Sequence, residues 1–323
     1  AWNGYRHLEI YYATSSSGLV CHTINPRLHP DQVSYIVNHA QDKVLCVDLN
    51  ILPLVEKASE NFKTVKAIII MTDNKNMVQP NIKDGINVIC YEDFIKDKPT
   101  HYEWPDIDEN SPLGLCYTSG TTGNPKGVEY EHRSQYLHTL ACSMTDSMAL
   151  SATDSVCGIV PMFHAMGWGI PWVGLMLGCK QVMPHRFMDP ARILDLMVAE
   201  DVTVSAGVPT IWQGVKAIYE AEPAKYDLSR LSRLTCGGSS PPLSLIRWCW
   251  DALGVEMIQG WGMTETSPLA TLSRRVMKRS QQSISDDAQF ENVAKAGQLM
   301  PGLEIEIFDC LLYTSDAADD ETS

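Results

Sequence analysis

The sequence predicts an α/β fold in which short strands and helices alternate and stack in layers around parallel-rich sheets. Short apolar runs, such as residues 66–71 and 231–236, alternate along the chain with longer segments that have helical periodicity. The chain has 323 residues, of which 45% are hydrophobic, so it can bury a large core. Because strands that alternate with helices pair in parallel, we expect parallel sheets covered by helices.

The first hundred residues begin this alternation. Residues 1–6 already have helical character, and we expect the native chain to start upstream of them. The polar, acidic segment at residues 102–111 predicts a surface linker. We expect strands at residues 18–24, 44–48, 66–71 and 86–90, and helices at residues 30–40, 52–61 and near Glu92.

The same pattern continues beyond residue 111. The last predicted element is a strand at residues 302–309, where apolar and polar side chains alternate. The other expected strands are residues 113–117, 128–132, 155–160, 180–183, 202–206 and 231–236, and the expected helices are residues 134–148, 190–199, 209–219 and 242–253.

One uncharged run raises the question of a membrane span. Residues 157–179 contain no Asp, Glu, Lys or Arg, and 23 residues are enough to cross a bilayer. However, the run contains Pro161, Pro171, His164 and five glycines. We therefore predict a buried strand, turn and helix here rather than a transmembrane segment. No signal peptide is recognisable, and because the ten cysteines are scattered and form no C-x-x-C pair, we predict a cytoplasmic protein.

The composition argues against several other functions. The chain has 25 basic and 39 acidic residues, and its net charge of -14 argues against binding to nucleic acid or to an anionic membrane. The ten cysteines include no C-x-x-C pair and the nine histidines no H-x-x-x-H pair, so we expect no zinc site. We interpret the cysteines as reduced core residues.

A loop rich in glycine and hydroxyl groups, residues 117–127, has the composition of a phosphate-binding site. Its glycines let backbone N–H groups approach phosphate oxygens, Lys126 supplies a positive charge, and Pro125 restricts the backbone before it. A Walker loop would need Ser or Thr after the lysine, but Gly127 follows, and an ordinary surface turn is the other alternative. The loop contains Thr118, Ser119, Gly120, Thr121, Thr122, Gly123, Lys126 and Gly127.

A second candidate segment, residues 259–268, includes an acidic residue between glycines and hydroxyl groups. Gly260 and Gly262 expose the backbone of what we expect to be a turn, and the Glu265 carboxylate can reach a hard cation. Mg²⁺ prefers one or two protein oxygens together with phosphate and water. On the alternative interpretation, Thr264 and Glu265 form an ordinary helix N-terminus, where both residue types are favoured.

These two segments resemble the signatures of the adenylate-forming superfamily, which includes acyl-CoA synthetases, luciferases and peptide-synthetase adenylation domains. In order and spacing the chain is similar to bacterial medium- or long-chain fatty-acid CoA ligases and 3-methylthiopropionate CoA ligases. The resemblance implies that residues 1–309 are an N-terminal AMP-binding domain, incomplete at both ends, without the small C-terminal domain. Residues 310–323 resemble the translation of a sequencing adapter, and we predict that they are not native. Further matching segments are residues 22–28, 161–164, 206–212 and 236–239.

The resemblance also implies roles for individual residues. Thr118 and Glu265 would hold the metal, and Lys126, Thr264 and Glu265 would be catalytic, with Trp168 as an aromatic gate to the acyl site. His164, Trp168 and Trp212 could equally be core residues. The resemblance assigns ATP or AMP to Thr118, Ser119, Gly120, Thr121, Thr122, Gly123, Lys126, Gly238, Gln259, Gly260, Trp261 and Thr264, and the acyl substrate to His164, Ala165, Trp168 and Gly238.

The reaction that the resemblance implies has two halves. A carboxylate attacks the α-phosphate of ATP to form acyl-AMP, with Mg²⁺ as cofactor, and the thiol of coenzyme A then displaces AMP. The ribose-binding aspartate, the hinge and the C-terminal catalytic lysine of the family are absent, so we expect this chain alone to be weakly active at best. An aryl-CoA ligase, an amino-acid adenylation domain and an inactive nucleotide-binding fragment remain alternatives. The resemblance suggests a homodimer.

Overall fold

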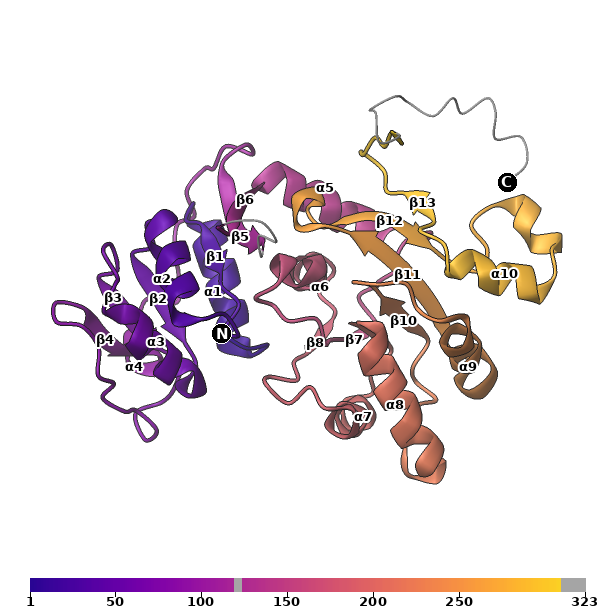
Figure 1. Cartoon of the computed structure of the whole chain (residues 1–323), viewed down its shortest axis with the longest axis horizontal. Helices are drawn as coiled ribbons and strands as arrows, with labels where there is room; N and C mark the ends of the chain where they lie inside the picture. The colour runs from indigo at the N-terminus through magenta and orange to yellow at the C-terminus, as the bar shows by residue number, and fades with distance from the viewer. Residues whose placement is uncertain (119–123, 309–323) are drawn as a thin grey trace.

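The computed structural model describes residues 1–118 and 124–308, and it contains three sheets arranged along the molecule (Figure 1). A three-stranded sheet in the order β2-β3-β4 forms one end, and a second, β1-β5-β6, lies next to it. A seven-stranded sheet in the order β13-β12-β11-β10-β9-β7-β8 forms the rest.

The strands are short, as the apolar runs of the sequence predict. In chain order they are β1 (Cys21–Thr23), β2 (Val44–Val47), β3 (Ala67–Ile70), β4 (Asn87–Cys90), β5 (Pro112–Thr118), β6 (Lys126–Glu131), β7 (Ser155–Gly158), β8 (Lys180–Val182), β9 (Val204–Gly207), β10 (Arg233–Cys236), β11 (Glu256–Gly262), β12 (Leu269–Ser273) and β13 (Gln298–Leu299).

Helices connect most of these strands. The α-helices are α1 (Tyr5–Ser16), α2 (Pro30–His39), α3 (Leu52–Ser59), α4 (Tyr91–Ile95), α5 (His132–Ser143), α6 (Ile170–Leu177), α7 (Pro190–Ala199), α8 (Pro209–Ala221), α9 (Leu243–Leu253) and α10 (Asp286–Val293). The 3₁₀ segments are η1 (Leu49–Ile51), η2 (Ala165–Gly169), η3 (Pro223–Lys225), η4 (Thr264–Thr266) and η5 (Arg279–Ser283).

The α/β class and the parallel-rich sheets are confirmed. Strands β2, β3 and β4 pair in parallel, as do β8, β7, β9, β10 and β11 in the large sheet. Three pairs depart from this pattern: β5–β6, β11–β12 and β12–β13 are antiparallel. Two of these antiparallel pairs, β5–β6 and β11–β12, carry residues of the candidate site.

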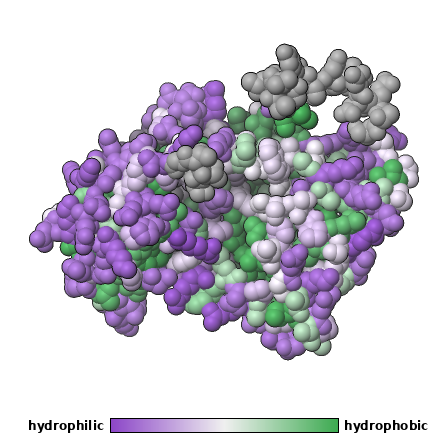
Figure 2. All heavy atoms as spheres, viewed as in Figure 1, coloured by the Kyte–Doolittle hydropathy of each residue, from purple (hydrophilic) through white to green (hydrophobic). Residues whose placement is uncertain are grey.

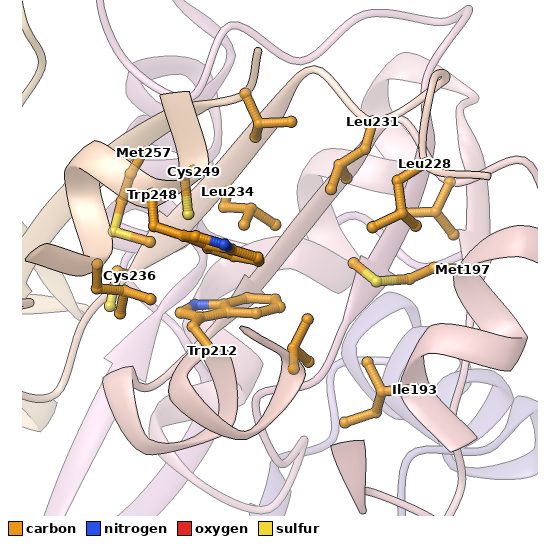
Figure 3. Close-up of a cluster of buried hydrophobic side chains, with 14 of the residues drawn as sticks. Ile193, Met197, Trp212, Leu228, Leu231, Leu234, Cys236, Trp248, Cys249 and Met257 are labelled. Atoms are coloured by element: carbon orange, nitrogen blue, oxygen red, sulfur yellow. The ribbon is translucent and has the colours of Figure 1, made fainter. Parts of the chain in front are cut away.

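Helices cover both faces of the large sheet. On one face, α7, α8, α9 and α10 enclose a buried cluster around Trp212, which is 0% exposed (Figure 3). On the other face, α5 and α6 pack through Cys142 and Val173 against Ala206 and Ile258 of the sheet. The large sheet is thus the middle of three layers, and Trp212 belongs to its core.

The other two sheets have smaller cores. Helices α2 and α3 pack on β2-β3-β4 through Val37, Val55 and Ile68. Helix α1 packs on β1-β5-β6 through Tyr11, whose hydroxyl donates a hydrogen bond to the carbonyl of Met162. Figure 2 shows that hydrophilic residues cover most of the visible face at the end of the molecule that contains the β2-β3-β4 sheet, in keeping with the acidic composition.

Three expectations about individual elements are resolved by the structure. Residues 157–179 form β7, η2 and α6, as predicted, and no helix within residues 1–118 and 124–308 is long and apolar enough to cross a bilayer. The helix expected at residues 134–148 ends earlier, at Ser143, because Met144 is extended. The strand expected at residues 302–309 is wrong for residues 302–308, where Ile305 and Ile307 are 55% and 70% exposed and no strand forms.

Candidate active site

Strands β5 and β6 contain the two ends of residues 117–127, the loop that the sequence predicts to bind phosphate. Thr118, the last residue of β5, is the register partner of Lys126, the first residue of β6. The Thr118 hydroxyl donates to the carbonyl oxygen of Lys126 over 3.5 Å. The sequence places a lysine here, and the antiparallel ladder brings it beside the threonine. The intervening candidates Ser119, Gly120, Thr121, Thr122 and Gly123 lie outside the described residues.

Tyr117 anchors the end of β5 to the neighbouring α2 and β1. Its hydroxyl oxygen lies 2.6 Å from Nδ1 of His39, and its ring lies 5.2 Å from the ring of His22. His22 in turn pairs with both carboxylate oxygens of Asp42 at 2.9 Å. Burial, and then the charge of Asp42, raise the pKa of Tyr117, so the phenol remains a neutral hydrogen-bonding group at neutral pH. Sequence reasoning missed this support, since no local pattern connects these residues.

The second candidate segment is a strand that ends in a tight turn. Gln259, Gly260 and Trp261 belong to β11, so the turn expected around Gly260 starts only at Met263. Residue 262 must be glycine, because a Cβ atom there would overlap the carbonyl of Pro268. Met263 and the 3₁₀ segment η4 then carry Thr264 and Glu265 to the surface.

The two segments meet at one pocket. Thr118, His164, Ala165 and Thr264 all line a cavity of about 260 Å³ beside β1 and α2. Glu265, next to Thr264, is exposed, and its charge contributes to raising the pKa of Tyr130, after burial and Cys116. Thus the phosphate-loop strand, the His164 segment and the Glu265 turn, which are far apart in the sequence, converge.

Trp168 packs against Gly237, the first residue after β10. A Cβ atom on Gly237 would lie 2.8 Å from Cη2 of Trp168 and 3.0 Å from the carbonyl oxygen of Gly260. The adjacent Gly238 has a φ of +80°, which disfavours any other residue. Trp168 therefore packs where Gly237 comes close to Gly260, directly before Gly238 in the chain.

His164, Trp261 and Gln259 have different surroundings. His164 lies at the pocket, where partial burial lowers the pKa of its ring, so it is neutral at pH 7. Trp261 is 41% exposed, leaving part of its ring free for contact. By contrast, Gln259 is 6% exposed and its amide lies 3.3 Å from the hydroxyl of Ser240. The side chain of Gln259 is therefore buried, and its backbone lies between the paired strands β10 and β12.

The donor atoms at the site suit magnesium bound jointly with phosphate. Among the described residues, no group of three or more His, Cys, Asp or Glu side chains could hold a metal alone. Glu265 and Thr118 are the carboxylate and hydroxyl oxygens that the two segments offer. Mg²⁺ commonly takes one or two protein oxygens and completes its shell with phosphate and water. The residues present therefore fit such an ion when a nucleotide is bound.

Solved structures share the fold. An anthranilate CoA ligase in complex with anthranoyl-AMP matches with a TM-score of 0.78 at 23% identity, over 95% of this chain and 55% of that one. A long-chain-fatty-acid-CoA ligase from Archaeoglobus fulgidus matches with a TM-score of 0.77 at 19% identity, over 96% and 58%. At this identity the likeness supports the fold only.

Relatives of known function are closer in sequence. A medium-chain-fatty-acid–CoA ligase from Ectopseudomonas oleovorans is 42% identical over 95% of this chain and 55% of its own length. A 3-methylmercaptopropionyl-CoA ligase from Ruegeria pomeroyi is 40% identical over 96% and 56%. The chain thus spans about half the length of these relatives. Residues 1–314 match the family described as AMP-binding enzyme, so the chain belongs to that family of adenylate-forming enzymes.

Proposed function

We propose that this chain carries the adenylation site of an ATP-dependent acyl-CoA ligase, an AMP-forming acid–thiol ligase. The observation that carries the proposal is the convergence of Thr118, His164 and Thr264 on one pocket, with Lys126 paired to Thr118. These are the positions that the resemblance assigns to phosphate, carboxylate and α-phosphate. The 40% and 42% identity to two CoA ligases supports the same reaction.

The reaction requires two anions to approach each other. A carboxylate oxygen attacks the α-phosphorus of ATP, the bond to the β-phosphate breaks, and pyrophosphate leaves with the electron pair. Lys126 offsets the phosphate charge, Thr118 and Glu265 offer oxygens to a metal, and Thr264 orients the α-phosphate. Mg²⁺, when bound, supplies additional charge neutralisation. The thiol of coenzyme A then attacks the acyl carbonyl, and AMP leaves.

The acyl group in this proposal is a fatty acid or a short sulfur-containing acid. Both classes occur in the printed names of relatives at about 40% identity. The neutral His164 at the pocket lets a carboxylate enter without first forming a tight ion pair. Trp168 packs against Gly237 and against the apolar core under α5 and α6, three residues after Ala165 of the pocket. Movement of this side chain would admit an acyl chain.

Three further properties belong to the same proposal. The enzyme would use ATP, Mg²⁺ and coenzyme A, act in the cytoplasm on a small carboxylic acid, and form a homodimer. The exposed apolar residues of α5, which include Tyr136 and Leu137 at 61% and 53% exposure, leave room for a contact between subunits. Sedimentation equilibrium of the purified protein tests the dimer directly.

The decisive experiment measures AMP formation with a panel of carboxylic acids and coenzyme A. Because the chain spans about half of its relatives, it is assayed alone and also fused to the remaining part of the Ectopseudomonas enzyme. We expect the fusion to form AMP with medium-chain acids or 3-methylthiopropionate, and the Lys126→Ala fusion to be much slower. A fusion that binds ATP but forms no AMP with any acid would refute the proposal.

A further inference from the structure

The segment Ala165–Gly169 has an unusual backbone. The φ angles of Ala165, Met166, Gly167, Trp168 and Gly169 are all positive, between +41° and +75°. Left-handed backbone is strained for a residue with a Cβ atom, because the Cβ atom lies too close to the following carbonyl oxygen. Three of the five residues carry one, so the surrounding structure must hold this left-handed turn in place.

Three contacts hold the left-handed turn, and each of them involves a glycine. In two contacts a side chain of the turn packs on a glycine elsewhere in the chain, and in the third the glycine belongs to the turn. Met166 is 0% exposed and packs so closely on Gly114 of β5 that a Cβ atom there would lie 2.9 Å from Cε of the methionine. Trp168 packs on Gly237 in the same way. At the third contact the glycine belongs to the turn itself, since a Cβ atom on Gly169 would overlap the ring of His138.

His138 connects the left-handed turn to the Glu265 turn. It is 7% exposed on α5, and its Nε2 accepts a hydrogen bond of 3.3 Å from the backbone N–H of Leu269, the first residue of β12. Burial lowers the pKa of His138 to about 4, which keeps the ring neutral and Nε2 able to accept. One imidazole therefore touches the end of the turn that carries Trp168 and the strand that follows Glu265.

We propose that His138 is a positioning residue that sets Trp168 relative to the Glu265 turn. The inference rests on the proposed function in one respect only, which is the assignment of these two turns to the acyl and nucleotide sites. A leucine would fill a helix position facing the core without desolvating a polar ring. The imidazole suits this position because its Nε2 accepts a hydrogen bond from the N–H group of Leu269 in the sheet. The absence of a side chain on Gly169 leaves space for the ring.

The first test compares two amide variants of the 323-residue chain that differ in reach. The amide of Gln can occupy the place of Nε2, whereas that of Asn is too short to reach Leu269. Each protein is labelled with 5-fluorotryptophan, and Trp168→Phe assigns the Trp168 fluorine resonance. We expect His138→Asn to shift or broaden the Trp168 resonance, and His138→Gln to restore it. The Trp212 resonance should stay unchanged in both variants, because Trp212 lies in the core on the opposite face of the sheet.

Other results of this test separate positioning from bulk packing. If the Trp168 resonance is the same in the parent, His138→Asn and His138→Gln, the proposal is wrong. Should both variants move the Trp168 and Trp212 resonances together, His138 contributes general stability rather than positioning, and the proposal is equally overturned.

The second test measures binding of a hydrolysis-resistant acyl-sulfamoyl adenosine and of AMP by titration calorimetry. We expect His138→Asn to weaken the acyl analogue about tenfold relative to His138→Gln, the effect of roughly one hydrogen bond, with AMP affinity changed less. Equal affinities in the two variants would refute the positioning role. If the active fusion with His138 unchanged binds neither compound, the proposed function fails instead, and the fluorine spectra alone decide the role of His138.

Discussion

Thr118 and Lys126 are paired at the last rung of the antiparallel strands β5 and β6, and the Thr118 hydroxyl donates to the Lys126 carbonyl over 3.5 Å. Pairing at a strand end holds the two backbones at a fixed separation, because the ladder on one side of them is continuous. The side chain of Lys126 is exposed, and its backbone is held by the strand pair next to the pocket that Thr118 lines.

Removing the Lys126 ammonium group should slow adenylation without unfolding the protein. A charge-assisted hydrogen bond contributes about 1.5–3 kcal/mol, so Lys126→Ala should lower the rate of carboxylate-dependent pyrophosphate exchange about 10- to 150-fold in the active fusion. Lys180→Ala is the matched control. Lys180 lies in β8 and pairs with Glu200 at 2.7 Å, so this variant should keep the parent rate. An unchanged exchange rate in Lys126→Ala would exclude a role in phosphate binding.

Trp212 should matter for stability and not for ligand binding. It is 0% exposed in the cluster under α7, α8 and α9 (Figure 3), so Trp212→Ala should lower the free energy of unfolding by about 3–5 kcal/mol. Urea denaturation followed by circular dichroism measures the loss, and Trp212→Phe should lose less. If Trp212→Ala weakened AMP binding while the urea midpoint stayed the same, Trp212 would belong to the site.

The alternation of strands and helices could be predicted from the sequence because each element carries its own apolar pattern. Residues 66–71 and 231–236 contain β3 and β10. The prediction from the apolar pattern failed where pairing with another part of the chain decides whether a strand forms. Residues 302–308 alternate like a strand, yet Ile305 and Ile307 stay exposed. Strand β12 and helix α10 were missed, since the segment from Leu269 onward has no strong period of its own.

The same distinction applies to the site. Thr118, Lys126 and Thr264 lie in short local motifs whose residue types suit phosphate, so the sequence indicates them directly. His138 and Leu269 are 131 residues apart, and the left-handed turn beside them depends on Gly114 of β5 and on Gly237, which follows β10 of another sheet. Contacts of this kind leave no local signal, so only the structure reveals them.

The buried cysteines should resist thiol reagents in the folded protein. The nine described cysteines are free, and eight of them are buried. Burial raises the pKa of Cys142, Cys157 and Cys249 to about 12, so at pH 8 on the order of one molecule in 10⁴ carries the reactive thiolate. Titration with Ellman's reagent should be slow at these sites in buffer. It should be complete in about 6 M guanidinium, which unfolds the protein. Rapid labelling of Cys142 in the folded state, located by mass spectrometry, would contradict its burial.

His138 should make the stability of the protein depend on pH below neutrality. Burial lowers its pKa to about 4, against about 6.5 for an unfolded histidine. Between these values the unfolded chain binds the proton and the folded protein does not, so the free energy of unfolding rises with pH up to about 6.5 and then levels off. One such group contributes roughly 1 kcal/mol per pH unit between about pH 5 and 6. His138→Gln cannot bind this proton, so its free energy of unfolding, from urea denaturation at several pH values, should rise less steeply by that amount. Equal slopes for the parent and His138→Gln would mean that the imidazole is not buried in its neutral form.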